Sequence, residues 1–148
     1  GNSVRVVSFA KPKAVNVTTS PYPLFPTDVQ PQIFASALFS DGVSSIKETV
    51  FENRFAHAKE FAKTGADVSV QGNLARIIGA RTQDRAIRLN ACDMTASDLR
   101  GGAGLMLAAL GLNGKSRVYG AEYIDRGYEK IEDMFCSLGA SVIRKNAR

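Results

Sequence analysis

The apolar residues of this chain follow helical spacing in four segments and strand-like alternation in several shorter ones. Apolar side chains recurring at helical intervals predict helices over residues 28–40, 56–64, 98–111 and 127–138. Alternating or β-branched runs predict strands over residues 2–9, 13–19, 44–48, 66–70, 74–80, 116–120 and 140–145. The "QGN" turn is predicted to join two of these strands as a hairpin. The pattern is that of a mixed α/β (α+β) protein.

The pattern occurs twice, because the stretch that begins at Asp28 resembles the stretch that begins at Asp98. The other matching pairs are Asp41-Gly42 with Asn113-Gly114, Asn53-Arg54 with Asp125-Arg126, and Gly65-Ala66 with Gly139-Ala140. We therefore predict one partial domain over 1–148, made of two β-α-β-α-β-β repeats. The first repeat is expected over 10–80 and the second over 81–148, with 1–9 as the stub of an earlier repeat.

Composition and charge narrow the class of protein. The 148 residues are 45% hydrophobic and 22% charged, which is ordinary for a soluble globular domain. No apolar run approaches the roughly 18 residues that would indicate a transmembrane helix, and no secretion signal is recognisable at the start. The net charge is +5, but the basic residues are scattered and Trp is absent, which argues against nucleic acid and favours small anionic substrates. Because the chain begins at Gly1, we expect a processed, tagged or truncated chain.

The cysteine and histidine content argues against a metal site. Cys92 and Cys136 lie far apart without a CxxC motif, and His57 is the single histidine, whereas a structural zinc site needs four good ligands. We expect reduced thiols in a cytosolic protein and place His57 on a helix surface. The Gly-rich "LRGGAGL" lacks the Lys-Ser/Thr of a phosphate-binding P-loop, so we do not interpret it as a nucleotide site.

Asp28 is the most distinctive candidate for chemistry. It lies where an apolar helix begins, after a loop stiffened by Pro21, Pro23 and Pro26. The free N–H groups and partial positive charge of a helix N-terminus favour an ionised carboxylate there. A plain cap, made by Thr27 or Asp28, and a positioned base are both compatible with this pattern.

Three arginines are candidates for binding anions. Arg54 and Arg126 occupy matching loops of the two repeats, and Arg100 follows the helix-opening Asp98. A guanidinium binds a carboxylate or phosphate through two parallel hydrogen bonds and stays charged. The alternative is that these arginines are exposed and paired with neighbouring acids, where each pair contributes little. Asp98 is expected to cap its helix and orient Arg100. The apolar positions Leu105, Leu107, Ala108 and Leu110 of that helix are expected in the core.

Four motifs in order resemble the UDP-N-acetylglucosamine enolpyruvyl transferase family. They are "SPYPLFPTDVQPQ", "ETVFENRFAHAKEFAKTGADV", "ASDLRGGAGLMLAAL" and "YIDRGYEKIEDMFCSLGASV". The resemblance implies an inside-out α/β barrel, with helices inside and sheets outside, in an enzyme of two domains with three repeats each. This chain resembles the last two repeats of one domain. The family's N-terminal Lys-Asn pair and its mobile loop with a reactive Cys are missing here, so neither Cys92 nor Cys136 takes that role.

The resemblance also implies the reaction and its site. The enolpyruvyl group of phosphoenolpyruvate moves to the 3'-hydroxyl of UDP-N-acetylglucosamine without a metal or organic cofactor, at the start of bacterial peptidoglycan synthesis. Asp28 would contact the attacking hydroxyl, and Arg100 and Arg126 would bind phosphoenolpyruvate and the intermediate. Arg54 would be a neighbouring cleft residue, and the backbone carbonyl of Val50 would meet the sugar.

Two departures from the family pattern and two rival hypotheses accompany the resemblance. The linker 79–97 is longer than the family pattern, and Gly101-Gly102 replaces small residues, which weakens the first turn of the helix. The isolated piece is expected to be inactive without the rest of its own chain. The rivals are an enolpyruvyl transferase of the shikimate pathway and a non-catalytic module of the same fold; "FPTDVQ" and "ETVFENRF" argue against the first.

Overall fold

The computed structural model describes residues 2–82 and 85–145. Its helical elements are η1 (Thr27–Val29), α1 (Gln30–Ala37), α2 (Ala58–Ala62), α3 (Leu99–Gly111), α4 (Ala121–Ile124) and α5 (Ile131–Ser137). Its strands are β1 (Asn16–Thr18), β2 (Val43–Lys47), β3 (Asp67–Gln71), β4 (Leu74–Ile78), β5 (Arg81–Thr82), β6 (Arg85–Ala86), β7 (Asp93–Thr95) and β8 (Arg117–Tyr119). The predicted α/β class is confirmed.

The first repeat forms a complete sheet of four strands in the order β1-β2-β4-β3. β1 runs parallel to β2, as expected for strands joined through a helix, and the other pairs are antiparallel. The predicted hairpin is confirmed, because β3 pairs with β4 and Gln71 lies opposite Leu74 across a two-residue turn. Gly72 opens this turn with φ 58, a conformation that glycine adopts without steric cost.

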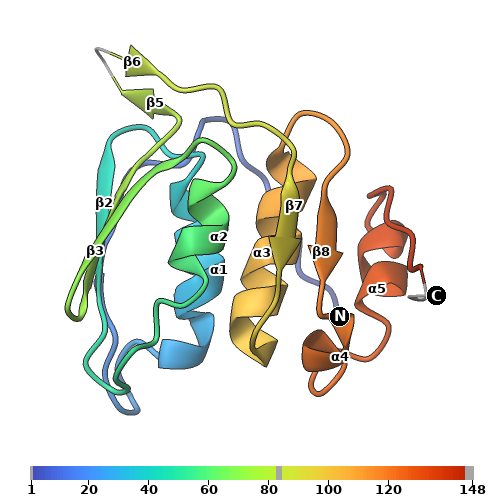
Figure 1. The fold of residues 1–148 in the computed structure, drawn as a ribbon, viewed down its shortest axis with the longest axis horizontal. Helices are drawn as coiled ribbons and strands as arrows, with labels where there is room; N and C mark the ends of the chain where they lie inside the picture. The colour runs from blue at the N-terminus through green and yellow to red at the C-terminus, as the bar shows by residue number, and fades with distance from the viewer. Residues whose placement is uncertain (1, 83–84, 146–148) are drawn as a thin grey trace.

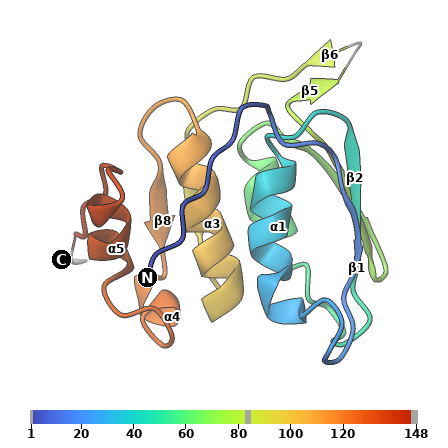
Figure 2. The same ribbon diagram turned by 180° about the vertical axis from the view of Figure 1, so that it is seen from behind.

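The second repeat begins in the same way. β7 and β8 are parallel and are connected through α3, just as β1 and β2 are connected through α1. The helices α1, α2 and α3 lie between the four-stranded sheet and the pair β7–β8, whereas α5 lies on the other side of β8 from α3 (Figures 1 and 2). A short hairpin of β5 and β6 lies in the linker between the repeats.

The two repeats share one hydrophobic core. Phe34 of α1, Leu38 directly after α1, Phe61 of α2 and Leu105 of α3 are fully buried in a single cluster. α3 approaches α1 closely because Gly104 has no side chain: a Cβ there would lie 2.8 Å from the carbonyl oxygen of Pro31. Gly104 therefore serves the packing of α3 against α1, although glycine lowers helix propensity.

Two predicted strands are not formed. Residues 2–9 and 140–145 carry strand-like sequence, but neither segment pairs with a strand among the described residues. Val4 and Phe9 are 91% and 96% exposed, which shows that the first segment lies on the surface. A β-strand requires a partner for its backbone hydrogen bonds, so alternation alone does not create one.

Several other predictions need correction. The helix expected over 127–138 is the shorter α5, preceded by α4, because Lys130 adopts a left-handed conformation with φ 46 that a helix interior excludes. Of the positions expected in the core of α3, Leu105 and Ala108 are buried, whereas Leu107 and Leu110 are 37% and 42% exposed. In the described part of the chain, no helix has the length and apolar character to cross a membrane.

Candidate functional site

The loop that carries Asp28 is fixed by its own hydrogen bonds. The backbone N–H of Ser20 donates to the carbonyl of Phe25 at 2.9 Å, which closes the proline-rich segment. The Thr27 hydroxyl donates to Glu48 Oε2 at 2.8 Å and so attaches the end of the loop to the residue that directly follows β2. Asp28 follows in the short helix η1, immediately before α1.

Both carboxylate oxygens of Asp28 bind arginines. Arg54 Nη2 lies 3.2 Å from Oδ1, and Arg100 Nη2 lies 2.9 Å from Oδ2. The hydrogen bond from Arg100 is the main reason that the pKa of Asp28 lies below its ordinary value, and the charge of Arg54 adds to it. Neither Asp28 nor Thr27 caps a helix through its side chain. The interpretation of this motif as a plain cap is therefore wrong, and Asp28 is an ionised carboxylate between two cations.

Glu48 supports two loops of the site, although the sequence analysis did not single it out. It is 2% exposed and accepts hydrogen bonds from the hydroxyls of Thr19 and Thr27 and from the backbone N–H groups of Val50 and Phe51. Burial alone would raise the pKa of Glu48, but these four hydrogen bonds lower it on balance. Glu48 therefore ties the loop of Asp28 to the loop of Val50. The signal available in the sequence was an acid at the end of the predicted strand 44–48.

Val50 and Arg54 belong to the loop that follows β2. The hydrogen bond from Val50 N to Glu48 Oε1, 2.8 Å long, fixes this part of the backbone. Arg54 Cζ lies 5.3 Å from the centroid of the Phe51 ring, so the guanidinium is held between an aromatic face and Asp28. Arg54 is preceded by Asn53, whose φ of 53 belongs to the left-handed region.

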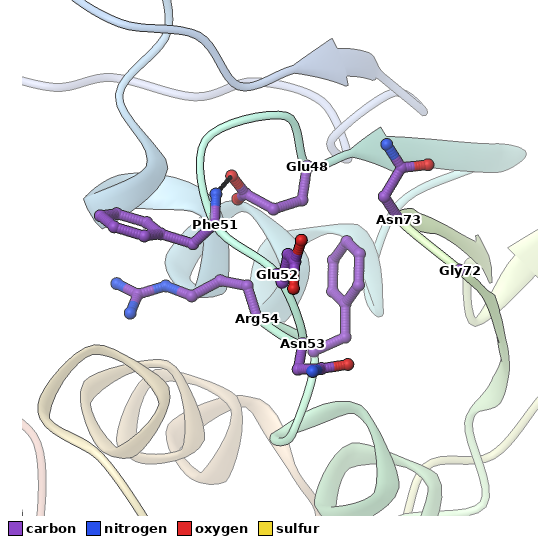
Figure 3. Close-up of a pocket in the computed structure, with 8 residues that line it drawn as sticks. Glu48, Phe51, Glu52, Asn53, Arg54, Gly72 and Asn73 are labelled. Carbon is purple, nitrogen blue, oxygen red and sulfur yellow. Dashed lines mark hydrogen bonds between the residues drawn. The ribbon is translucent and has the colours of Figure 1, made fainter.

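A shallow pocket lies beside this loop. It has a volume of about 220 Å³, and it is lined by Glu48, Phe51, Glu52, Asn53, Arg54, Phe55, Gly72 and Asn73. Figure 3 shows the side chains of Phe51 and Arg54 extending from the loop, and Asn73 on the β3–β4 turn. Arg54, one of the two arginines that bind Asp28, thus also lines the pocket.

Asp98 and Arg100 enter from the second repeat at the start of α3. Asp98 Oδ1 accepts a hydrogen bond from Gly101 N at 2.8 Å, which confirms the predicted cap. Arg100 forms its ion pair with Asp28, which also raises the pKa of Arg100. Asp98 therefore caps the helix that carries Arg100, and Arg100 itself forms a contact across the two repeats.

Arg126 lies on the turn next to Arg100. The turn packs closely at Gly127, where a Cβ would lie 2.8 Å from Leu99 and 3.5 Å from Arg100 Nη1. Arg126 is exposed, and within the described residues it forms no ion pair. The structure thus joins Asp28, Arg54 and Arg100 directly and places Arg126 on the adjacent turn.

His57 is buried, contrary to the prediction of a surface position. It is 3% exposed, and its ring lies 5.3 Å from Phe34 and 5.6 Å from Phe61 in edge-on contacts. Burial lowers the pKa of His57 to about 4, with the charge of Asp98 opposing the shift and that of Arg54 reinforcing it. At neutral pH the imidazole is uncharged and belongs to the core below the site.

The two cysteines show no sign of metal or reactive-thiol chemistry in the described part of the chain. Cys92 and Cys136 are free thiols, and burial raises the pKa of Cys92, which disfavours the reactive thiolate. No cluster of three or more histidine, cysteine or acidic side chains suited to a metal ion occurs in 2–82 and 85–145.

The arrangement of α1, α2 and α3 between two groups of strands matches a known class of structure. The enolpyruvyl transferase NikO from Streptomyces tendae aligns with a TM-score of 0.80 and 28% identity, over 95% of this chain and 31% of that chain. The fold is therefore that of a fragment of an enolpyruvyl transferase.

Sequence comparison identifies the family. The family model of EPSP synthase (3-phosphoshikimate 1-carboxyvinyltransferase) matches residues 2–135, and the chain belongs to this family. Relatives named UDP-N-acetylglucosamine 1-carboxyvinyltransferase include one from Campylobacter jejuni, 43% identical over 97% of this chain, and one from Campylobacter fetus, 44% identical over 96%. The chain spans 33% and 32% of the length of these relatives, respectively.

Proposed function

We propose that the protein containing this chain transfers the enolpyruvyl group of phosphoenolpyruvate to the 3'-hydroxyl of UDP-N-acetylglucosamine. The observation that carries the proposal is the Asp28 carboxylate held between Arg54 and Arg100, in a chain whose relatives bear the name of that transferase. The reaction would make it a bacterial cytoplasmic enzyme of peptidoglycan synthesis and cell-wall formation.

The proposed chemistry is an addition followed by an elimination. The sugar hydroxyl loses its proton and its oxygen bonds to C2 of phosphoenolpyruvate, while C3 gains a proton. Loss of a proton from C3 and departure of phosphate from C2 then restore the double bond. The addition needs a base at the hydroxyl, and both steps need cations at the carboxylate and phosphate.

The ion pairs of Asp28 suggest how a base of low pKa can become effective. In the structure, the hydrogen bond from Arg100 lowers the pKa of Asp28, which makes it a weak base. Anionic substrate groups compete for the same guanidinium groups of Arg54 and Arg100. Their binding would remove hydrogen bonds from Asp28, raise its pKa and so couple substrate arrival to base strength.

The two rival hypotheses make different predictions. The match to the EPSP synthase family favours an acceptor such as shikimate 3-phosphate as the second candidate. A non-catalytic module would bind neither acceptor productively, although it could retain the fold. Asp28, Arg54 and Arg100 meet from distant parts of the sequence on a half-exposed surface, an arrangement that a purely structural module does not need.

The test is phosphate release by the full-length protein. We expect release only with phosphoenolpyruvate and UDP-N-acetylglucosamine together, and not with shikimate 3-phosphate. Asp28→Asn should abolish turnover while the protein still binds the nucleotide sugar. Turnover with shikimate 3-phosphate would favour the second candidate, and no turnover with either acceptor would favour the module. The 148-residue chain alone is expected to show no turnover.

A further inference from the structure

Arg144 binds the acids at both ends of the turn that carries Arg126. Its Nη1 and Nη2 atoms donate to the two carboxylate oxygens of Asp125, at 2.8 and 2.6 Å. Its Nε and Nη2 atoms donate to the two oxygens of Glu132, at 2.7 and 3.0 Å. Asp125 directly follows α4, and Glu132 is the second residue of α5. One side chain therefore connects the two ends of the segment 125–132.

The geometry distinguishes this contact from an ordinary surface ion pair. Two edges of the planar guanidinium each face a carboxylate, so that both acids are bound through paired hydrogen bonds. The side chains of Arg144, Asp125 and Glu132 are 34%, 42% and 18% exposed. Exposed pairs usually contribute little, but paired geometry and a network of charges are the conditions under which they matter.

The turn itself has features that make an external tether useful. Its backbone is held by the N–H groups of Gly127 and Tyr128, which donate to the carbonyl of Ile124. At its far end, Lys130 adopts φ 46, a conformation that residues other than glycine seldom favour. Arg126 is exposed and, among the described residues, has no acid as an ion-pair partner to define its position.

We propose that Arg144 is a positioning residue for Arg126, fastening the turn 125–132 at both ends so that the Arg126 guanidinium is presented beside Arg100. The role of Arg126 toward an anionic substrate rests on the proposed function, whereas the tether rests on the hydrogen bonds of Arg144. The tether has a second effect, because it engages Asp125, the acid adjacent to Arg126, and keeps it from competing with substrate anions.

Arginine is specifically required for this role. A lysine ammonium can carry the same charge, but it cannot present two flat edges to two carboxylates at once. Arg144→Lys should therefore resemble Arg144→Gln rather than the wild type. Arg117→Gln provides the matched control, because Arg117 is an exposed arginine of the same repeat that pairs with Asp93 at 3.4 Å, away from the turn.

The first measurement is hydrogen–deuterium exchange of the full-length protein, read by mass spectrometry on peptides that cover 125–131. Arg144→Gln and Arg144→Lys should both exchange faster than the wild type in this segment. Arg117→Gln should leave it unchanged. Unaltered exchange of the turn in Arg144→Gln would overturn the tether.

The second measurement is steady-state kinetics of the same variants. We expect the KM for phosphoenolpyruvate to rise about tenfold in Arg144→Gln, because small displacements of a binding group have large effects. The KM for UDP-N-acetylglucosamine should stay near the wild-type value, a split that general destabilisation would not produce. Asp125→Asn, which removes one end of the tether, should also raise the KM for phosphoenolpyruvate.

The two measurements separate the inference from the proposed function. Faster exchange with an unchanged KM for phosphoenolpyruvate would overturn the link between the tether and Arg126. If the wild-type protein shows no transfer at all, the proposed function is wrong. The exchange of the turn then decides whether Arg144 is a tether.

Discussion

The buried His57 makes a quantitative prediction about stability and pH. It is the single histidine of the chain, and it lies among Phe34, Phe55 and Phe61. In the folded protein burial lowers its pKa from an ordinary value of 6.5 to about 4. The unfolded chain therefore takes up a proton at a higher pH than the folded chain does, and acid favours unfolding.

The size of the effect follows from this difference in pKa. Above 6.5 the imidazole is neutral in both states, and the stability linked to it is fully present. As the pH falls, this stability is lost, and the loss is complete once the pH passes below the folded pKa of about 4. Linkage gives a loss of about 2 kcal/mol between about pH 7.5 and about pH 5, approaching about 3 kcal/mol near pH 4.

The assay compares the wild type with His57→Phe, which keeps an aromatic ring but cannot take up a proton. Urea unfolding of both proteins at about pH 7.5 and about pH 5 gives the two free energies of unfolding, and carboxylates remain mostly ionised at both values. The wild type should lose about 2 kcal/mol more than the variant does. The imidazole NMR signal of the single histidine should meanwhile show a mostly neutral ring in the folded protein at about pH 5.

Two results would refute this reasoning. One is an equal pH dependence of stability in the wild type and His57→Phe. The other is a folded-state titration of the histidine near its ordinary value, which would mean that the ring is accessible to water. If the phenyl ring fits poorly, His57→Leu provides the same comparison, because the test depends on the change with pH and not on absolute stability.

Three further predictions concern the support of the site and the helix packing. Glu48→Ala should lower the free energy of unfolding by about 4 kcal/mol, because four hydrogen bonds of about 1 kcal/mol each lose their acceptor. Glu48→Gln should lower it by less than half of that amount. Urea unfolding measures both variants. Asp28→Asn should change the free energy of unfolding by less than about 1 kcal/mol in the same assay, because the Asp28 side chain is 52% exposed. A larger loss would mean that the ion pairs of Asp28 serve stability, which would contradict their proposed role in function. Gly104→Ala should lower the free energy of unfolding by about 1 kcal/mol, because the added methyl group meets Pro31 O at 2.8 Å and the strain exceeds the gain in helix propensity. An increased melting temperature would contradict the close contact of α1 and α3.

Local features of the fold were predictable because neighbouring residues determine them. The α3 helix follows from its apolar spacing and from the cap of Asp98, whose acceptor lies within hydrogen-bond reach of Gly101. The β3–β4 hairpin follows from alternation on both sides of a turn that needs Gly72. The internal repeat was also predictable, because detecting it requires only a comparison of the sequence with itself. The segments 2–9 and 140–145 mark the limit, because a strand also needs a distant partner.

Apart from Glu48, the residues that meet at the candidate site were predictable, but their arrangement was not. The motifs indicated Asp28, Arg54 and Arg100, yet only the packing of α3 against α1 brings Arg100 to an acid 72 positions away. Burial was even harder to predict, because Glu48 and His57 are polar residues, and polar residues usually lie at the surface. Sequence by itself determined the internal similarity, the helices α1, α2 and α3 and the candidate groups, since these depend on short-range spacing. Tertiary structure alone decided which charges meet and which polar groups are buried, because both depend on contacts between segments that the sequence keeps apart.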